Sequence, residues 1–417
     1  MVRGSRGVDE LVSDILTRHD STTRRELAAV VADEYLAADD EARRAFLDKL
    51  ARKFWTSRED VDTAAKQLAS AGDDLTARTA AEQQLRAALT PPATELLHIF
   101  TGLDDGVKLL VDLRADLLRL ADDDPALRAL DAELQAHLAT LFDVGLLELR
   151  QITWDSPASL LERLIEYEAV HAIDSWADLK NRLDSDRRCY AFFHPAMPSE
   201  PLVFVEIALT AGVATELQSL LDESAPDLDP ERADTAVFYS ISSCQPGLAG
   251  VNLGTALIKE VVERLRRDLS NVRTFVTLSP IPGFRPWVDE QLRTGQLSDR
   301  ERDLLPAEPA RVLARLDDAD WGADESIGPA LTALCARFLT TSLGGRALDP
   351  VANFHLSNGA ALDRVTWGAD SSPTGRARSV GLMANYLYEP NRIAERAEAY
   401  AKHGTITTSD VVRDLLA

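Results

Sequence analysis

The stretch Ala236-Val237-Phe238-Tyr239-Ser240-Ile241, followed by Gln245-Pro246-Gly247-Leu248-Ala249-Gly250, decides the fold class of the second half of the chain. Its first part is a β-type run, and its second part is a glycine-bearing turn. The turn leads into a helical pattern with an apolar residue at every fourth position from Leu257, and another β-type run follows from Thr274 to Ser279. Because strand, glycine turn, helix and strand in this order form a βαβ-like unit, we predict a mixed α/β domain.

Further β-type runs are expected on both sides of this unit. The first is Cys189–Phe193, which we predict to pair as a hairpin with Leu202–Leu209 across a loop rich in Pro, Met and Ser. Strands are expected again from Ala361 to Trp367 and from Gly381 to Tyr388. Between these regions, a helical insertion is predicted at about 287–345.

The chain up to about residue 150 has a different pattern, with few glycines and few β-branched runs. Apolar residues recur there at helical spacing, and Asp124-Pro125 supplies an N-cap and a first residue for one helix. We therefore predict an α+β chain, with an all-α helical bundle at 1–150 and a mixed α/β domain at 151–417. The leucine stripes are expected to pack the core of the bundle. Some of them are expected to face a second copy of the chain, in a homodimer or homotetramer.

The composition is that of an ordinary folded protein and argues against several classes of partner. Of the 417 residues, 45% are hydrophobic and 27% are charged, and the net charge is −23. An acidic chain lacks the basic face that binds phosphate backbones, so we expect neither a nucleic acid nor a membrane as partner. A small anionic ligand can still be held by a few local amides and arginines.

The three cysteines, Cys189, Cys244 and Cys335, are widely spaced and odd in number, which fits neither a zinc site nor a set of disulfides. The opening residues up to Gly7 include no apolar signal segment, and no run of the sequence is apolar enough to span a membrane. We therefore predict a cytoplasmic protein and expect no metal site.

A hydroxyl and an imidazole lie in two stretches where regular structure is expected to end. Ser279 closes a β-type run and is followed by Pro280 and Pro282, while His355 precedes Asn358-Gly359, which favours a turn. Side chains at such positions can face a cleft. Most serines and histidines are structural, so the pair alone is weak support for a catalytic site.

The glycine turn from Gln245 to Gly254 is a candidate phosphate cradle. Glycine lets backbone N–H groups approach a phosphate closely, and the helix that follows presents the positive end of its dipole. The turn matches neither a Walker loop nor a dinucleotide fingerprint, and taken alone it is more simply interpreted as a plain helix start.

Several uncommon sequence motifs follow one another along the second half of the chain. They are Arg187-Arg188-Cys189-Tyr190, Glu200-Pro201-Leu202-Val203, Phe238-Tyr239-Ser240-Ile241-Ser242, Gly247 to Thr255, Ser279-Pro280-Ile281-Pro282-Gly283-Phe284, Asn353-Phe354-His355-Leu356-Ser357-Asn358-Gly359-Ala360 and Gly381-Leu382-Met383-Ala384-Asn385-Tyr386. In this order they resemble the malonyl-CoA decarboxylase family. The resemblance spans roughly 145 to 390, and the first 140 residues are similar to the family only in helical character.

The resemblance implies a catalytic domain with the fold of the GNAT acetyltransferases, which binds an acyl-CoA. It implies that malonyl-CoA is converted to acetyl-CoA and CO2 without biotin, metal or another cofactor. It further implies that Ser279 and His355 bind substrate and are catalytic, and that Tyr388 orients this pair. The residues implied to bind the CoA pyrophosphate are Ala249, Gly250, Val251, Asn252, Leu253, Gly254 and Thr255. Asn252 departs from the acid of animal members, so an essential carboxylate is not expected there.

The chemistry of such a reaction explains why a hydroxyl and an imidazole would be needed. Loss of CO2 from a malonyl thioester leaves a carbanion whose charge moves onto the thioester oxygen, so donors at that oxygen lower the barrier. We hypothesise that His355 then protonates the carbon as a general acid. Ser279 either hydrogen-bonds the malonyl carboxylate or relays a proton to His355, rather than forming an acyl-enzyme.

Two other functions are compatible with the sequence. One is a GNAT-type acyltransferase that uses the same CoA cradle together with an acceptor amine, and the other is a non-catalytic acyl-CoA-binding regulator. Among the remaining polar residues, His171 and His194 are more simply structural, and Cys244 is expected to be packed. Arg376 and Arg378 lie in a Gly/Ser-rich stretch that we read as a loop, where they either meet an anionic group of the substrate or are solvated.

Overall fold

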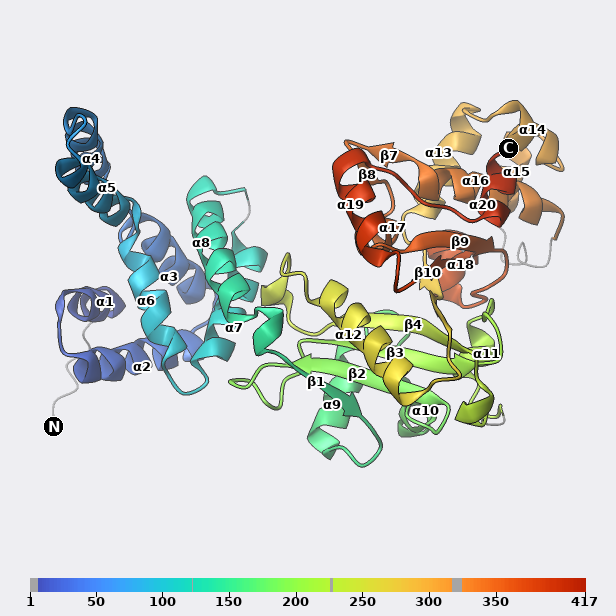
Figure 1. Cartoon of the computed structure of the whole chain (residues 1–417), viewed down its shortest axis with the longest axis horizontal. Coiled ribbons are helices and arrows are strands. Elements are labelled where there is room, and N and C mark those ends of the chain that lie inside the picture. The colour runs from blue at the N-terminus through green and yellow to red at the C-terminus, as the bar shows by residue number, and fades with distance from the viewer. Residues whose placement is uncertain (1–6, 122, 226–227, 317–324) are drawn as a thin grey trace. The chain divides into compact units, whose positions relative to one another are not determined.

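The computed structural model describes residues 7–121, 123–225, 228–316 and 325–417 (Figure 1). The chain divides into two compact units. We call Met1–Glu148, Phe193–Leu202 and Gln245–Asn252 the helical unit, and Leu149–Phe192, Val203–Cys244 and Leu253–Ala417 the mixed unit. The prediction that the chain opens without a signal segment concerns residues 1–7. Residues 1–6 lie outside the described residues.

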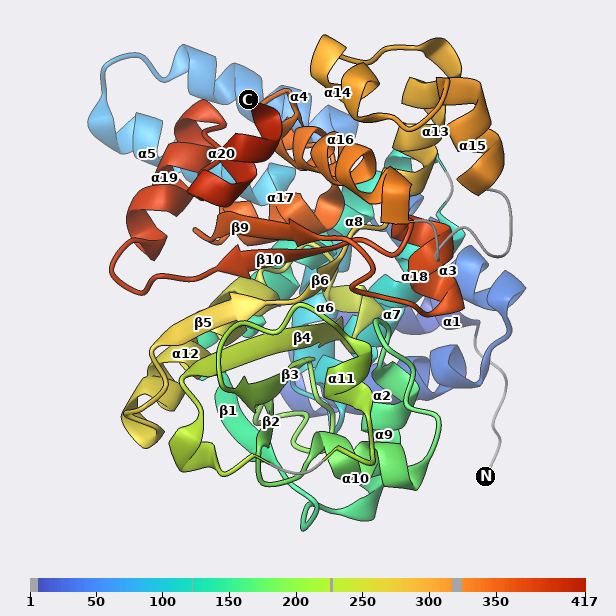
Figure 2. The same ribbon diagram turned by 90° about the vertical axis from the view of Figure 1, so that its right-hand side faces the viewer.

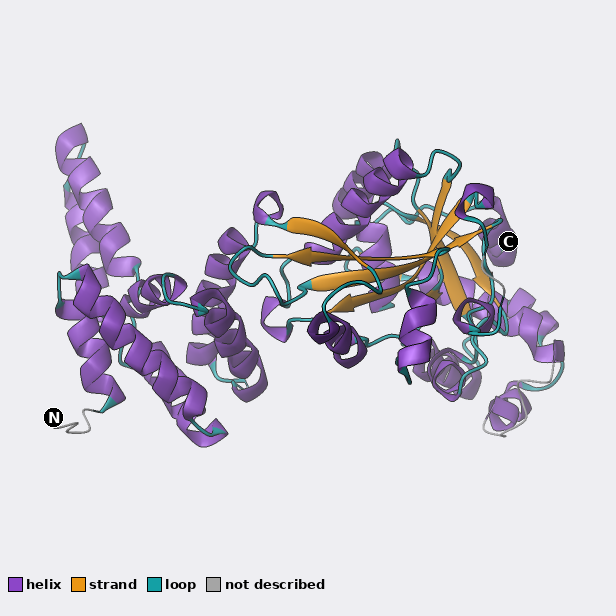
Figure 3. Cartoon of the chain, turned by 90° about the horizontal axis from the view of Figure 1, so that it is seen from below, coloured by secondary structure: helices purple, strands orange, loops and turns teal. Residues whose placement is uncertain are grey.

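The helical unit is built from successive helices, drawn in purple in Figure 3. They are α1 (Val8–Thr17), α2 (Ser21–Ala37), α3 (Asp40–Arg52), α4 (Arg58–Ser70), α5 (Leu75–Leu89), α6 (Pro92–Thr101), α7 (Gly106–Leu120), α8 (Pro125–Leu141) and the short 3-10 turns η1 (Val144–Leu146) and η3 (Pro246–Leu248). Polar residues begin several of them. Asp124 accepts a hydrogen bond from the N–H of Ala126 at the start of α8, whose first residue is Pro125, as predicted. The predicted leucine stripes of α7 and α8 are largely buried.

The mixed unit alternates strands, drawn in orange in Figure 3, with helices. Its strands are β1 (Glu148–Ile152), β2 (Arg187–Phe193), β3 (Val203–Thr210), β4 (Thr235–Ser243), β5 (Thr274–Thr277), β6 (Ser279–Pro280), β7 (Ser342–Leu343), β8 (Arg346–Ala347), β9 (Ala361–Thr366) and β10 (Met383–Leu387). Its helices are α9 (Ala158–Tyr167), α10 (Trp176–Arg182), α11 (Gln218–Leu221), η2 (Pro230–Arg232), α12 (Leu253–Asp268), α13 (Phe284–Thr294), α14 (Asp299–Leu304), α15 (Pro309–Leu316), η5 (Glu325–Ile327), α16 (Gly328–Thr340), α17 (Pro350–Ser357), α18 (Pro373–Ser379), α19 (Ile393–His403) and α20 (Asp410–Leu416).

One sheet organises the mixed unit. Within the described residues it has eight strands, in the order β1-β2-β3-β4-β5-β10-β6, with β9 paired to β10. β2 and β3 form the predicted antiparallel hairpin, while β4 and β5 are parallel and joined through α12, as the βαβ prediction requires. β10 is antiparallel to β5, β6 and β9, and Figure 2 shows α17 close to β9.

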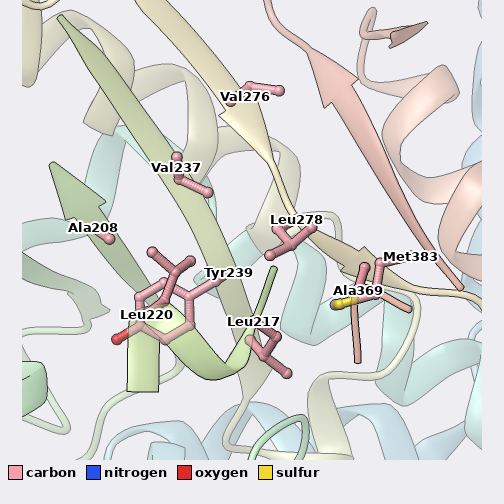
Figure 4. Packing of buried hydrophobic residues seen from close by; sticks show 9 residues of the cluster. All are labelled: Ala208, Leu217, Leu220, Val237, Tyr239, Val276, Leu278, Ala369 and Met383. Atoms are coloured by element: carbon pink, nitrogen blue, oxygen red, sulfur yellow. The ribbon is translucent and has the colours of Figure 1, made fainter. Parts of the chain in front are cut away.

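Apolar packing holds the helices of the mixed unit to this sheet. A cluster of buried residues joins β3, β4, β5 and β10 to α11 (Figure 4): Ala208, Leu217, Leu220, Val237, Tyr239, Val276, Leu278, Ala369 and Met383. The helix α12 buries the predicted stripe of Leu257, Val261 and Leu265. The fourth member of that stripe, Leu269, follows the end of the helix at Asp268.

The predicted fold class is confirmed, because an all-α region precedes a mixed α/β region. Two local predictions were wrong. A strand, β1, precedes the first expected run at Cys189. Pro373–Ser379 is a helix rather than the predicted loop. Pro350–Ser357 is a helix for which no prediction was made, and in both helices a capping residue comes directly before a proline at the first helical position. The predicted helical insertion at 287–345 contains α13 to α16, and its residues 317–324 lie outside the described residues.

Candidate active site

Three elements of the mixed unit bring the predicted catalytic residues together. Ser279 begins β6 and lies opposite Ala384 of β10. Tyr388 directly follows β10, and its N–H donates to the carbonyl oxygen of Phe275 in β5. His355 lies in the last turn of α17. The strands β6 and β10 and the helix α17 therefore position the three side chains.

The helix α17 forms because both of its ends are specified locally. Asp349 caps its first turn, and Pro350 is its first residue. Asn358 follows its last residue, and Gly359 turns the chain with a φ of 83°, which favours glycine. The predicted turn at Asn358-Gly359 is present, and His355 lies in the last turn of the helix that ends before it.

A chain of hydrogen bonds passes through the imidazole of His355. Nε2 lies 3.0 Å from the Ser279 hydroxyl, and Nδ1 lies 2.9 Å from the Tyr388 hydroxyl. The Ser279 hydroxyl also donates to Oγ1 of Thr277 over 2.8 Å. Because a hydroxyl has a single proton, the bond between Ser279 and His355 must use a proton on Nε2. Nδ1 of the neutral ring is then the acceptor of the Tyr388 hydroxyl.

Burial keeps these groups neutral. The exposed fractions of Ser279, His355 and Tyr388 are 5%, 3% and 1%. Desolvation lowers the pKa of His355 to about 3 and raises the pKa of Tyr388 above its ordinary value. Near neutral pH the site therefore holds a neutral imidazole and a protonated phenol.

Thr277 and Tyr386, which sequence reasoning missed, fix the position of the pair. The Tyr386 ring stacks on His355 with centroids 4.6 Å apart and an interplanar angle of 24°. Oγ1 of Thr277 accepts from the backbone N–H of Tyr386 and from the hydroxyl of Ser279. The period of a strand could have identified Thr277, because residues two apart point to the same face and Thr277 precedes Ser279 by two.

Asn358, also missed, connects the site to the start of α12. Its Oδ1 accepts from the hydroxyl of Thr255 over 2.5 Å. Its side chain lies close enough to the phenol to lower the pKa of Tyr388, against the larger effect of burial. Its Nδ2 is buried and has no hydrogen-bond partner within the described structure. Next to Thr255, a Cβ on Gly254 would lie 3.0 Å from the ring of Phe354, so the glycine lets α12 and α17 approach closely.

The predicted pyrophosphate segment, Ala249–Thr255, belongs in part to each unit. Its residues up to Asn252 group with the helical unit, and α12 begins at Leu253 in the mixed unit. In the turn before this segment, Gly247 packs closely against the backbone of α7. A Cβ on Gly247 would lie 1.8 Å from the carbonyl oxygen of Val111 in α7, so only glycine fits there.

His194 and Cys244 have the structural surroundings that the simpler interpretation predicts. In the helical unit, the ring of His194 packs on Phe142 with centroids 5.0 Å apart, and its Nδ1 accepts from the N–H of Ala196. In the mixed unit, Cys244 is buried. Neither lies next to Ser279 or His355 in the contacts described above.

His171 and Arg378 line a second region of the mixed unit. Together with Asp370 they border a cavity of about 400 Å³. Arg378 is exposed, and Arg376 is half-buried. Both arginines belong to α18 and not to the loop predicted from the sequence.

A separate group of buried polar side chains in the mixed unit carries charge. Arg182 donates to both carboxylate oxygens of Asp178, at 2.8 and 3.0 Å, and to Glu206 at 3.1 Å. Glu168 accepts from the hydroxyl of Ser240 at 2.8 Å. Burial and the nearby Glu168 raise the pKa of Glu206 to about 8. We call Glu168, Asp178, Arg182 and Glu206 the charged cluster.

The described residues include neither a helix that could cross a membrane nor a cluster that could hold a metal ion. None of the helices in this part of the chain is both long and apolar enough to cross a membrane. No group of three or more His, Cys, Asp and Glu residues in the same part is placed to hold a metal ion.

Comparison with protein families gives matches over both halves of the chain. The model described as "Malonyl-CoA decarboxylase C-terminal domain" matches residues 145–417, and the model described as "Malonyl-CoA decarboxylase N-terminal domain" matches residues 54–142. The second match corrects the expectation that the first 140 residues are similar to the family only in helical character.

Individual relatives agree with the family models. The mitochondrial malonyl-CoA decarboxylase of Rattus norvegicus is 38% identical over 361 residues, which cover 81% of this chain and 73% of the relative. The crystal structure of malonyl-CoA decarboxylase from Rhodopseudomonas palustris is 39% identical, with a TM-score of 0.88 over 98% of both chains. That of the enzyme from Agrobacterium vitis is 36% identical, with a TM-score of 0.90 over 98% of this chain and 99% of the other.

Proposed function

The chain belongs to the malonyl-CoA decarboxylase family, and from this premise we propose that His355 protonates the carbon from which CO2 has departed. The chain is accordingly an enzyme that decarboxylates malonyl-CoA. The observation that carries the proposal is the hydrogen-bonded chain from Ser279 through His355 to Tyr388.

The proposed reaction breaks the bond between the carboxylate carbon and the α-carbon of the malonyl group. The electron pair of that bond moves into the thioester as an enolate, and CO2 leaves. The enolate carbon then takes the proton of His355 Nε2, which gives acetyl-CoA. Nδ1 takes the proton of the Tyr388 hydroxyl, and water restores it after the product has left. The tautomer inferred above supports this direction, because Nε2 carries the proton and Nδ1 accepts.

Ser279 is proposed to position the imidazole by accepting a hydrogen bond from Nε2, rather than to act as a nucleophile. Its hydroxyl donates to Thr277 and is therefore not aimed at His355, as it would be in a serine activated by a histidine base. The low pKa of His355 points the same way, because a weakly basic imidazole is poorly suited to deprotonate a hydroxyl.

The CoA end of the substrate is proposed to lie at the segment Ala249–Thr255, with the pyrophosphate bound by backbone N–H groups. The support is that α12 begins within this segment and that Gly250 has a φ of 81°, a backbone conformation that favours glycine. A metal- and cofactor-free reaction, a homo-oligomer and a cytoplasmic location stay predictions from the sequence.

Turnover of malonyl-CoA without an acceptor tests the proposal. Incubation should release CO2 and acetyl-CoA in equal amounts, and acetyl-CoA in D2O should slowly exchange its methyl protons through the same enolate. Ser279→Ala should lower both rates while the melting temperature stays close to that of the unmodified enzyme. Near-normal rates in this variant would remove Ser279 from the mechanism, and transfer of an acetyl group to an added amine without CO2 release would favour an acyltransferase.

A further inference from the structure

The enolate oxygen of the proposed reaction needs a hydrogen-bond donor, and Asn358 carries an unused one. Oδ1 of Asn358 accepts from the Thr255 hydroxyl over 2.5 Å. Nδ2 carries two N–H groups, and even if one faces the nearby Tyr388 hydroxyl, the other is available to another acceptor. Nδ2 is buried and unpaired in the described structure, and the residue is only 4% exposed. Buried amide donors nearly always have a partner, so an unpaired one next to a reacting group indicates a ligand atom.

The position of Asn358 fits such a role. It caps the C-terminal end of α17, three residues after His355, and positions three apart in a helix lie on the same side. Its side chain also lies beside the phenol of Tyr388, which contacts the other nitrogen of the imidazole. The unused donor is therefore next to the residues that handle the proton.

We propose that Nδ2 of Asn358 donates a hydrogen bond to the thioester oxygen of malonyl-CoA and stabilises the enolate that forms when CO2 leaves. This inference rests on the proposed function. Thr255 acts as a positioning residue, because its bond to Oδ1 fixes which side of the amide faces the substrate. A neutral amide suits the task, because it stabilises the negative oxygen without protonating it in place of the carbon.

The malonyl carboxylate is the other acceptor that a buried amide could meet, and the chemistry argues against it. Loss of CO2 removes the charge of the carboxylate, so a donor placed there stabilises the substrate more than the transition state. A donor at the thioester oxygen becomes stronger as the reaction proceeds, because negative charge accumulates on that oxygen.

Two variants, Asn358→Ala and Asn358→Asp, test whether the amide binds the thioester oxygen or the carboxylate. Asn358→Asp keeps the acceptor for Thr255 but loses the N–H donors. The two measurements are kcat for malonyl-CoA and proton exchange of acetyl-CoA. Removal of one oxyanion donor should lower kcat for malonyl-CoA by about 100-fold or more, with KM little changed. Exchange of the methyl protons of acetyl-CoA in D2O should fall by a similar factor, since it passes through the same enolate without a carboxylate. A raised KM with unchanged exchange would overturn the inference in favour of carboxylate binding.

Controls separate a local effect from loss of the fold or of the proposed function itself. Asn353→Ala removes another amide from α17, one that accepts from the Tyr400 hydroxyl at 2.8 Å, and should keep kcat within a few-fold. Thr255→Val should lower kcat less than Asn358→Ala does. If Asn358→Ala loses melting temperature but keeps both rates, the role is structural and the inference is wrong. If the unmodified enzyme releases no CO2 from malonyl-CoA, the proposed function fails instead.

Discussion

Two groups of buried polar side chains lie in the mixed unit, and they satisfy their hydrogen bonds in different ways. In the charged cluster, Arg182 is engaged by Asp178 and Glu206. The candidate active site is neutral, and it leaves the Nδ2 donor of Asn358 without a partner in the described structure. Burying charges without full pairing carries a large free-energy penalty, whereas a neutral group tolerates an open donor at a smaller one. The comparison separates two roles. Buried groups whose hydrogen bonds are all made within the protein contribute to the fold, whereas the unpaired donor of Asn358 can bind an atom of the substrate.

The largest expected effect comes from removing the imidazole of His355, which belongs to the candidate active site and not to the charged cluster. His355→Asn should lower kcat for malonyl-CoA by about 10²- to 10⁴-fold, because the proton donor to the enolate carbon is lost. The matched control is His171→Asn, which changes the histidine that lines the separate cavity and should keep kcat within a few-fold. CO2 release measures both. Equal losses in the two variants would contradict the assignment of chemistry to His355.

Breaking the charged cluster should act on stability instead. Arg182→Met leaves the Asp178 carboxylate buried without its cation and removes the hydrogen bond to Glu206, so the free energy of unfolding should fall by about 3–5 kcal/mol in denaturant titrations. Arg264→Met removes a half-exposed ion pair with Asp268 and should leave the free energy of unfolding almost unchanged. Per folded molecule, kcat should be unaffected in both. A specific loss of kcat in Arg182→Met would mean that the two groups are not separable.

Tyr388→Phe should produce a smaller loss within the site. The variant removes the hydrogen bond to Nδ1 of His355 and the proton that Tyr388 supplies there. We expect kcat to fall by less than in His355→Asn, because the general acid itself is kept and the ring still packs. Tyr190→Phe changes another buried tyrosine of the mixed unit and should have no effect on kcat. A loss as large as that of His355→Asn would show that the phenol does more than orient the ring and replace its proton.

A separate expected effect is a pH dependence of stability, which comes from Glu206 of the charged cluster. The pKa of Glu206 is about 8 in the folded protein and 4.5 as its ordinary value, so the folded chain holds a proton that the unfolded chain has lost. Stability should therefore fall as pH rises from about 4.5 to about 8, by up to about 1.4 kcal/mol per pH unit. His355, with its pKa lowered from 6.5 to about 3, acts in the opposite direction but only below about pH 6.5.

The window from pH 6.5 to 8 therefore isolates Glu206 from His355. Unfolding titrations across it should show a downward slope that Glu206→Gln flattens, while kcat shows no ionisation of His355 near 6.5. The same slope in Glu206→Gln would assign the titration to another group.

The sequence predicted the fold where local signals and tertiary packing agree. The βαβ unit around α12 and the β2–β3 hairpin followed from apolar periodicity and turn residues. It failed at α17 and α18, where short helices offer little periodicity and the informative signal was a cap followed by proline. At α17 the following Asn-Gly pair was given more weight than the cap, and at α18 the Gly- and Ser-rich composition was.

The candidate site was predictable only in part, for a similar reason. Ser279, His355 and Tyr388 were predicted as site residues because they lie in motifs that resemble those of a known family. Asn358 was read only as a turn residue, since an Asn-Gly pair indicates backbone geometry and says nothing about where the amide points. Its bond to Thr255 joins positions 103 residues apart in the chain, a distance that local patterns do not cover.

The first turn of α12 and the last turn of α17 pack closely: a Cβ added at Gly254 would lie 3.0 Å from the ring of Phe354, and Thr255 donates to Asn358 over 2.5 Å. A larger residue at position 254 would therefore require the Phe354 ring to move. Because His355 follows Phe354 in the chain, we expect such a substitution to disturb the imidazole without contacting it.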